Sequence, residues 1–442
     1  MTVDLLVVGA GSAGSVLAER LSAAPDRRVT VLEAGPGPAD PAVRALTDDA
    51  TVLPLGAGSP VIRRYRTTLT VDPPRLAEIV RGCCLGGSGA VNGGYFCRAL
   101  PGDFDAAPGW SWSEVSEHYR AIEARISVGY AHEFAGPTAA FTAAAERAGY
   151  RWLPDLSADA DGMGSVPLNI VDGVRRGPGA VFLEPALDRP NLSVLTGTRV
   201  SRVLFSGGRA TGVQAIGPDG PLRFDADAVV LSAGAVESAH LLMLSGIGPA
   251  ASLSALGVTV LADLPVGQRC WDHPEWVMGT GRSGARGHPV LEAVLVEQGL
   301  EVRPYTTGFG SLTAGIGVAL MRPRSRGRVS LVSTDPAVPP RIEHRYDSEP
   351  ADVADLRRGC DLVAGIVGGA TELGTPAWST SQHLGGTAPM GTGGDAVVDP
   401  RCRVHGVSGL WVVDSSVLPR PLSRGPHATV AMVGHRAAEF IY

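Results

Sequence analysis

The sequence contains no lysine, so all 38 of its basic residues are arginines. We interpret this bias, together with the abundance of Ala, Gly, Pro and Val, as the result of a GC-rich bacterial genome. The formal net charge is −6, and no basic stripe occurs that could neutralise the phosphates of a nucleic acid or an anionic membrane. Nucleic acid is therefore not expected as a partner.

Long apolar runs and closely spaced cysteines are also absent. Glu237, His240 and Asp263 interrupt the longest apolar candidates, so no stretch of about 18 residues suits a transmembrane segment. The six cysteines form no CxxC pair and no ligand-spaced cluster with histidine, so we expect neither a metal site nor a disulfide framework. The chain starts without a basic region, apolar signal core or cleavage site, which predicts a cytoplasmic protein.

The composition is that of a globular enzyme with more than one lobe. Hydrophobic residues make up 44% and charged residues 19% of the 442 residues. At roughly 100–200 residues per domain, this length predicts two or three lobes.

The N-terminal segment predicts one βαβ unit. Residues 3–8 are an apolar run suited to a strand buried on both faces of a parallel sheet, and residues 9–14 read G-x-G-x-x-G. A helix is expected at 15–24, where apolar residues recur at helical spacing, and a second strand at 29–32.

This unit is suited to a dinucleotide. Gly9 permits a tight turn, Gly11 lets the backbone approach a pyrophosphate, and Gly14 lets the helix lie close to the strand. The Glu33 carboxylate, at the end of the second strand, is placed to accept hydrogen bonds from an adenosine ribose. A glycine-rich turn without a ligand is the structural alternative. The residues predicted to contact this nucleotide are Gly9, Gly11, Ser12, Ala13, Gly14, Glu33 and Ala34.

A second glycine-rich loop, at 81–94, bears on the choice between FAD and NAD. Its glycines and small polar residues suit a backbone that lies against a flat ring system and phosphates. A plain NAD dehydrogenase needs no second loop of this kind, although a purely structural loop fits the residues equally well. The cofactor-binding residues predicted here are Arg81, Gly86, Gly87, Ser88, Asn92 and Gly93.

The later segments supply further cofactor candidates. A β-rich stretch is expected at 191–233, and the strand at 226–235 ends in Ser-Ala-Gly-Ala, like the strand that flavoproteins place beside the first βαβ unit. A strand near 410–413 leads to Asp414, whose carboxylate can meet cofactor hydroxyls, and a closing helix is expected at 429–441. The candidates from these segments are Val200, Ala233, Asp414, Ser415 and Thr429.

The remaining stretches are less regular in pattern. Residues 36–80 are Pro-rich and are expected to run irregularly over the surface. A helix is expected near 112–126, and 275–380 is expected to form an antiparallel sheet with one helix around 352–367.

Two of the ten histidines stand out. His383 and His427 flank the 410–413 strand in Gly- and Pro-rich surroundings, which could bring both over one ligand. A satisfied structural histidine is the alternative at each position. Most others, such as His118, His132 and His288, have polar neighbours and are expected at the surface.

Four blocks, at 3–35, 81–98, 228–249 and 383–439, resemble in this order the glucose–methanol–choline (GMC) oxidoreductases. Asp272-His273-Pro274 also resembles the segment that precedes the substrate domain in this family. The resemblance implies an α/β fold in which an FAD-binding Rossmann-type domain is interleaved with an antiparallel-sheet substrate domain. The implied boundaries are 1–100, 185–274 and 384–442 for the FAD-binding domain, and 101–184 and 275–383 for the substrate-binding domain.

The resemblance also implies a mechanism, in which a CH–OH group loses its hydroxyl proton to His383 and hydride to the flavin. His427 hydrogen-bonds the substrate oxygen in this scheme. Some members attach FAD through a histidine just before the loop asparagine; here that position is Val91, so FAD is expected to bind non-covalently. Alternatives are a generic dehydrogenase or oxidase of small alcohols, a non-redox cyanohydrin lyase, and a flavin-loaded electron-relay protein.

A closer resemblance concerns one branch of the family. The segments at 91–98 and 272–276, in a shortened chain, are similar to the mycofactocin-associated members. This resemblance implies that reduced mycofactocin (mycofactocinol) is the donor and that electrons pass towards a respiratory electron acceptor. It also implies a cytoplasmic protein that can lie peripheral to the inner face of the membrane.

Overall fold

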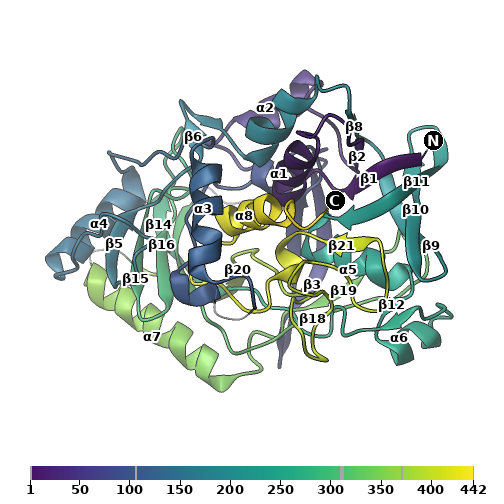
Figure 1. Cartoon of the computed structure of the whole chain (residues 1–442). Coiled ribbons are helices and arrows are strands. Elements are labelled where there is room, and N and C mark those ends of the chain that lie inside the picture. Colours follow the sequence, from purple (N-terminus) through teal and green to yellow (C-terminus); the bar gives the residue numbers. More distant parts are fainter. Residues whose placement is uncertain (1, 105–106, 309–312, 370–371, 442) are drawn as a thin grey trace.

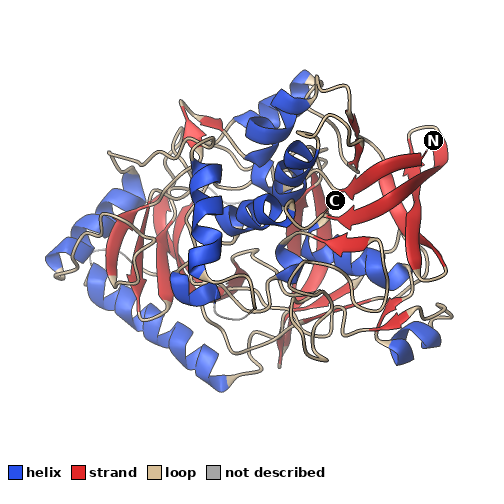
Figure 2. Cartoon of the chain, in the orientation of Figure 1, coloured by secondary structure: helices blue, strands red, loops and turns tan. Residues whose placement is uncertain are grey.

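The computed structural model describes residues 2–104, 107–308, 313–369 and 372–441. Within these residues the strands form a seven-stranded, a six-stranded and a four-stranded sheet, and two short two-stranded pairs. Figure 2 shows the two larger sheets at opposite sides of the molecule, with helices on them and between them. In Figure 1 the C-terminal helix lies beside the first helix, so the end of the chain packs on its N-terminal unit.

The seven-stranded sheet contains the predicted βαβ unit. Its parallel pairings place Val8 beside both Leu32 and Leu231, so three strands end at the same edge of the sheet. Gly434 brings the C-terminal helix against the first helix, since a Cβ there would lie 2.5 Å from the carbonyl oxygen of Ala13. The sheet order is β8 (Leu192–Leu195), β2 (Val29–Leu32), β1 (Thr2–Val8), β11 (Gly220–Leu231), β10 (Arg209–Gly217) and β9 (Arg199–Ser206), with β21 (Leu410–Val412) beside β11.

The predicted antiparallel sheet is present as the six-stranded sheet. The N-terminal half of the chain adds one strand to it, and the predicted helix at 352–367 is α7 (Pro350–Val367). Ile316, Val318 and Leu320 are buried against Leu356 and other apolar residues of this helix. The sheet order is β20 (Ala377–Thr380), β14 (Pro274–Ser283), β17 (Thr313–Leu320), β16 (Leu300–Pro304), β15 (Ala293–Glu297) and β5 (Gly162–Ser165).

The prediction of an irregular excursion at 36–80 is wrong for its second half. Two long strands, β3 (Ile62–Val71) and β4 (Pro74–Gly82), form a hairpin. β3 pairs with β19 (Arg341–Glu343), which pairs in turn with β18 (Arg328–Ser330). Tyr65, Thr67 and Leu69 are buried at alternate positions of β3. This period of two is the strand signal, which the neighbouring prolines had obscured.

The predicted helices at 15–24, 112–126 and 429–441 are present with shifted ends. A capping box of Ser111 and Glu114 fixes the start of the second one. The helices are α1 (Ser12–Leu21), α2 (Pro41–Asp48), α3 (Trp112–Glu123), α4 (Gly136–Arg147), α5 (Gly234–Leu244), α6 (Ala250–Ala255) and α8 (His427–Ala437). Short elements are η1 (Gly87–Ala90), η2 (Pro101–Phe104), η3 (Gly179–Leu183), η4 (Glu184–Ala186), η5 (Ser415–Val417), β6 (Ile170–Val171), β7 (Val174–Arg175), β12 (Ile247–Gly248) and β13 (Ala262–Asp263).

His118 is buried, so its predicted surface position is wrong. Its Nδ1 lies 2.8 Å from Nδ1 of His435, between α3 and α8. Val115, His118, Tyr119 and Ile122 recur at helical spacing and are all buried, so His118 belongs to the apolar face of its helix. His132, by contrast, is exposed as expected.

Candidate active site

A cavity of about 590 Å³ lies where the seven-stranded sheet, the β3–β4 hairpin and the six-stranded sheet meet. Ligand sites usually occupy roughly 300–1,000 Å³. The residues that follow β1, β2 and β11 border one end, and β14, β16 and β20 border the other. The predicted site residues that line the cavity are Gly9, Gly11, Ser12, Ala13, Glu33, Ala34, Arg81, Gly87, Ser88, Asn92, Gly93, Val200, Ala233, His383, Asp414, Ser415 and His427.

Three predicted residues lie behind this lining. A Cβ at Gly14 would lie 2.0 Å from the carbonyl oxygen of Gly9, so Gly14 allows α1 to approach the first loop. The N–H of Gly86 donates to the carbonyl oxygen of Ala10 at 2.8 Å and ties the two loops together. Thr429 is fully buried, and its hydroxyl is hydrogen-bonded to a tyrosine of α3. These residues shape the site from outside the cavity.

The two glycine-rich loops touch each other at the start of α1. A Cβ on Gly87 would lie 2.7 Å from Cα of Gly11, so any side chain there would separate the loops. Gly11 is also the N-cap of α1 and has no side chain to bind the first N–H groups of the helix. Those N–H groups and the positive end of the helix dipole remain available to a phosphate.

Glu33 ends β2 with its carboxylate fixed by the backbone. Oε2 accepts a hydrogen bond from the N–H of Ala10 at 2.9 Å, and Oε1 accepts one from the N–H of Gly35 at 2.8 Å. Burial raises the pKa of this carboxyl, and the backbone N–H groups oppose that rise. Each carboxylate oxygen has a further lone pair, so the group can still accept a hydrogen bond from a hydroxyl in the cavity.

The carboxylate of Asp414 accepts more hydrogen bonds from the protein than the carboxylate of Glu33 does. Its Oδ2 accepts hydrogen bonds from the N–H of Gly234 and the hydroxyl of Ser238, at 2.9 and 2.6 Å. Its Oδ1 accepts two more from Ser416, and burial raises the pKa of the carboxyl. Asp414 therefore joins the end of β21 to the start of α5, besides forming part of the cavity wall.

Arg81 supports the segment that precedes His383. Its Nη1 donates to Oε1 of Gln382 at 3.0 Å, and the N–H of Val80 donates to the same oxygen at 2.8 Å. Gln382 has a φ of +63°, a left-handed conformation that costs about 1–3 kcal/mol for a residue other than glycine. The bonds to its side chain, and one from its N–H to Thr380, offset this strain and hold His383 at the cavity.

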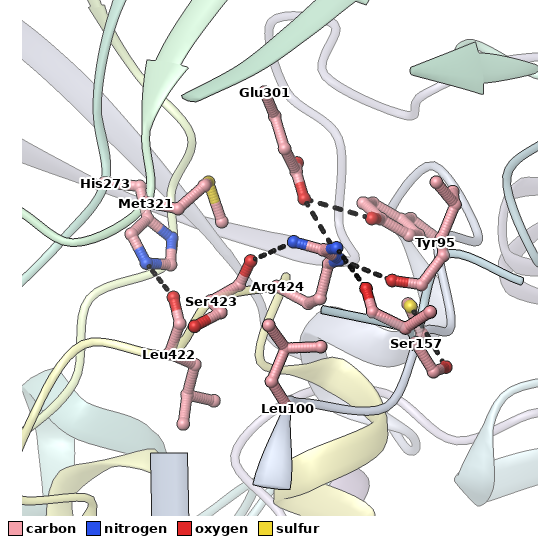
Figure 3. Close-up of polar contacts among 12 residues, drawn as sticks. Tyr95, Leu100, Ser157, His273, Glu301, Met321, Leu422, Ser423 and Arg424 are labelled. Carbon is pink, nitrogen blue, oxygen red and sulfur yellow. Dashed lines mark hydrogen bonds and ion pairs between the residues drawn. The ribbon is translucent and has the colours of Figure 1, made fainter. Parts of the chain in front are cut away.

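His383 is hydrogen-bonded to a second histidine, His273. Their Nδ1 atoms are 2.8 Å apart, and Nε2 of His273 lies 2.9 Å from the carbonyl oxygen of Leu422 (Figure 3 shows the second contact). Burial lowers the pKa of His273 to about 4. Burial also lowers the pKa of His383 well below 6.5, with smaller contributions from His273, Arg303 and Arg81. Both rings are therefore neutral at neutral pH.

These contacts assign the tautomer of each ring. The carbonyl of Leu422 can only accept, so Nε2 of His273 carries its proton and Nδ1 carries a lone pair. That lone pair accepts the Nδ1–H of His383. Nε2 of His383 is consequently unprotonated, and His383 is partly exposed to the cavity it lines. The arrangement presents a proton acceptor to a ligand.

The buried carboxylate of Asp272 anchors both histidines. Its Oδ1 accepts hydrogen bonds from the backbone N–H groups of His273 and His383, each at 2.7 Å. Its Oδ2 accepts from the hydroxyls of Tyr346 and Thr380, at 3.0 and 2.8 Å. One carboxylate thus fixes the spacing of two segments that are far apart in the sequence.

His427 has the opposite tautomer. Oδ1 of Asn92 accepts the N–H of Gly94 at 2.9 Å, so the Asn92 amide turns its NH₂ group towards Nδ1 of His427, 3.1 Å away. Nε2 of His427 therefore carries the proton. No described residue accepts it, and it lies beside Gly89 and Ser12, where the two loops meet. Burial lowers the pKa of His427 to about 4.

The sequence reasoning missed several residues around the cavity. It assigned no role to Asp272, His273 or Gln382, nor to a polar group at the far end of the cavity formed by Glu275 and Arg303. Three titratable side chains within Asp272-His273-Pro274-Glu275, directly before a strand, were a usable signal for the first of these. The partners that these residues contact lie too far along the chain to be read from spacing.

Loops suited to a dinucleotide and an unprotonated imidazole in one cavity define an oxidoreductase with a bound nucleotide cofactor. Comparison with known families makes the class specific. The two profiles of GMC oxidoreductases match residues 3–275 and 323–434. The chain belongs to the GMC oxidoreductase family.

Individual relatives agree with this assignment along the whole chain. An uncharacterised GMC-type oxidoreductase of Rhodococcus erythropolis is 40% identical over 99% of this chain and 98% of its own length. The oxygen-dependent choline dehydrogenase of Vibrio vulnificus is 30% identical over 99% of this chain and 94% of its own length. The crystal structure of pyridoxine 4-oxidase from Mesorbium loti superposes with a TM-score of 0.90, at 28% identity and 99% coverage of both chains. The predicted GMC fold is confirmed.

GMC oxidoreductases bind FAD, and this chain is an FAD-dependent oxidoreductase. The residues present fit the cofactor. The start of α1, which has no side-chain cap, offers N–H groups to the phosphates, and the Glu33 carboxylate can accept a ribose hydroxyl.

The first prediction concerns Glu33. Replacing Glu33 with Arg removes the acceptor of two backbone N–H groups and places a cation at the end of β2, so we expect weaker FAD binding. Loss of a charge-assisted hydrogen bond costs about 1.5–3 kcal/mol. Glu33→Gln, which keeps one acceptor oxygen, serves as the matched control with a smaller loss. Flavin content after dialysis measures the effect, and equal content in Glu33→Arg and the unchanged protein would contradict it.

The second prediction concerns the attachment of FAD. Val91 is buried beside Val43 and Val61, and its side chain offers no atom for a covalent bond to the flavin. Acid or heat denaturation should therefore release FAD into the supernatant. Flavin absorbance that stays with the precipitated chain would show a covalent link elsewhere, and release of NAD would overturn the cofactor assignment.

Proposed function

We propose that the protein oxidises a CH–OH group, with His383 as the base that takes the hydroxyl proton. The observation that carries this proposal is the unprotonated Nε2 of His383 at the cavity, fixed by the chain of hydrogen bonds through His273 to Leu422. Relatives named choline dehydrogenase and alcohol dehydrogenase support the same class of donor. When bound, FAD accepts the hydride that the carbinol carbon loses.

The hydrogen bond from His383 to His273 persists after His383 takes a proton. Its Nδ1–H donates to His273 in the neutral ring and also in the imidazolium, so proton transfer to Nε2 requires no rearrangement behind the ring. The Asp272 carboxylate, which accepts the backbone N–H of His383, adds a nearby negative charge. A base that is preorganised in this way lowers the cost of removing a weakly acidic alcohol proton.

His427 is proposed to donate its Nε2–H to the oxygen of the donor as negative charge develops there. In this structure Gly89 and Ser12 shield that nitrogen, so the role requires the ring to turn when FAD and the donor are bound. Gly425, two residues earlier, lies against the ring of His383, since a Cβ there would be 3.5 Å from Cε1. The two histidines therefore belong to one wall of the cavity.

The finer proposal is that mycofactocinol is the donor and that a respiratory electron acceptor receives the electrons. Three residues of the segments that resemble the mycofactocin-associated members support this proposal. Asn92, Tyr95 and Glu275 line the cavity, where they can contact the donor. Within the described part of the chain, no helix is long and apolar enough to cross a bilayer. Contact with the inner face of a membrane, where such an acceptor resides, is accordingly proposed as peripheral.

Anaerobic mixing of the holoenzyme with reduced mycofactocin and with simple alcohols tests both levels of this proposal. Loss of the oxidised-flavin absorbance with any alcohol supports CH–OH oxidation and excludes a non-redox cyanohydrin lyase. Re-oxidation by a quinone analogue faster than by oxygen supports a respiratory acceptor. An electron-relay protein would pass electrons even after both histidines were replaced.

The third prediction concerns the histidine pair. His383→Ala should bind FAD almost normally yet reduce it about 10²–10⁴-fold more slowly, because no other group replaces the base. His427→Asn should be milder, since an amide still donates a hydrogen bond but need not accept a proton. Stopped-flow reduction, normalised to bound flavin, measures both variants. An unchanged rate per flavin in His383→Ala would place the base elsewhere.

The fourth prediction is a pH profile. Burial lowers the pKa of His383 well below 6.5, so its imidazole is unprotonated at neutral pH. The rate of flavin reduction should be flat above about pH 7 and should fall at lower pH as the ring takes up a proton. This acid limb should be missing in His383→Ala. A limb with its midpoint above the ordinary histidine pKa would contradict the assignment.

A further inference from the structure

We propose that the alcohol donor carries no positive charge, and that Arg303 enforces this by neutralising the carboxylates at the donor end of the cavity. The inference rests on the proposed function and specifies the chemical class of its substrate. Glu275 and Arg303 line the cavity together with Tyr305, Trp378 and Ser381.

Arg303, on β16, joins two buried carboxylates. Its Nη2 lies 2.8 Å from Oε2 of Glu301, and its Nη1 lies 3.3 Å from Oε2 of Glu275, on β14. The side chains of Arg303, Glu275 and Glu301 are 4%, 2% and 0% exposed, so water screens these charges little. The three form a compact ionic cluster at the cavity wall.

A second guanidinium completes the charge balance behind this wall. Nε of Arg424 lies 4.0 Å from Oε1 of Glu301, and the hydroxyl of Tyr95 donates to the same oxygen at 3.2 Å (Figure 3). The carbonyl oxygens of Leu156 and Ser423 hold the Arg424 side chain in place. Two carboxylates thus face two guanidinium groups, and the cluster has no net charge.

The groups of this cluster are already paired with one another. Glu275 accepts hydrogen bonds from the hydroxyls of Tyr305 and Ser381, at 2.6 and 3.0 Å, in addition to Arg303. Arg303 donates from Nε and Nη2 to Glu301, and from Nη1 to Ser381 and Glu275. Neither an anionic nor a cationic donor would find a counter-ion here that is not already engaged.

The sheet is shaped to hold this cluster. Glu275 and Glu301 both pair with Ala319 of β17, one from each side, and Arg303 pairs with Gly317. Side chains from β14 and β16 therefore meet across β17, where Gly317 and Ala319 leave room. A Cβ on Gly317 would lie 1.9 Å from Oε1 of Glu275. The small residues are needed for the carboxylate to reach its arginine.

Two further carboxylates of the cavity lining are also paired with arginines. Glu78 pairs with Arg64 and Glu237 with Arg63. Arg81, beside His383, forms no ion pair with a described residue, and its buried Nη2 has no hydrogen-bond partner among them. A cationic donor would meet carboxylates that are already paired and an unpaired guanidinium, so it would give up its hydration without gaining an opposite charge, at a cost of several kcal/mol per ion in a buried site. A neutral alcohol avoids this cost.

Matched alcohols that differ only in charge test the inference on the holoenzyme. Choline and 3,3-dimethylbutan-1-ol form one pair; 4-(trimethylammonio)benzyl alcohol and 4-tert-butylbenzyl alcohol form another. Anaerobic titration gives the dissociation constant of each from the flavin spectrum, and stopped-flow mixing gives its reduction rate. We expect the neutral member of a pair to bind at least about tenfold more tightly and to reduce the flavin more efficiently.

Variants assign the selectivity to Arg303. Arg303→Met leaves Glu275 and Glu301 facing one guanidinium, so the preference should shift towards the cationic member by at least about tenfold. Glu275→Gln should shift it in the opposite direction, and the double variant should return towards the original ratio because its charge is again balanced. Arg324→Met, which removes an exposed arginine paired with the buried Asp352 of α7, should leave the ratio unchanged.

Distinct outcomes separate this inference from the proposed function. If no alcohol reduces the flavin but the neutral members bind preferentially, the function fails and the charge selectivity stands. Equal or tighter binding of the cationic members to the unchanged protein overturns the inference, as does the absence of binding by both neutral members. If Arg303→Met does not fold, an unshifted ratio in Glu275→Gln is sufficient to overturn it.

Discussion

The proton between His273 and His383 has one permitted position, and the chemistry of the site depends on it. The carbonyl oxygen of Leu422 cannot donate, so the hydrogen bonds run in one direction from Nδ1–H of His383 to that oxygen. If His273 were protonated on both nitrogens, its Nδ1–H would compete for the same space, and His383 would have to present its lone pair to its neighbour. Burial, which lowers the pKa of His273 to about 4, prevents this arrangement. The low polarity of the surroundings thus keeps the reactive lone pair on the cavity side.

At both ends of the cavity, buried polar groups need hydrogen-bond partners. Different kinds of group supply these partners at each end. At the nucleotide end the donors are backbone N–H groups, at the loops and at the start of α1, because phosphates and ribose hydroxyls need close approach more than charge. At the donor end the groups are long side chains from an antiparallel sheet, such as Glu275 and Arg303, and they satisfy one another. We propose that backbone geometry holds the cofactor common to the whole family, whereas the donor faces side chains that substitution can change.

The sequence predicted the parts of the site that are contiguous in the chain. The turn at Gly9–Gly14, the acid at Glu33 and the loop at 81–94 each carry their chemistry within a few residues, and all three border the cavity. His273 and His383 are 110 positions apart and meet only because Asp272 binds both backbones. Such a pairing has no local signature. The prolines on either side of β3 also led to a wrong prediction. The alternate residues Tyr65, Thr67 and Leu69 of this strand are buried.

One strand shows how a cavity face can be recognised before a structure is known. Residues 314–320 read Ala-Gly-Ile-Gly-Val-Ala-Leu, and the large residues Ile316, Val318 and Leu320 all turn towards α7. The alternating small residues must then face the other way, since successive side chains of a strand point to opposite faces. A face made of Gly and Ala in the middle of a buried sheet cannot fill space itself, so long side chains of the adjacent strands must cover it. In this protein those side chains are Glu275, Glu301 and Arg303, and their charges had to be paired because both sides of the strand exclude water.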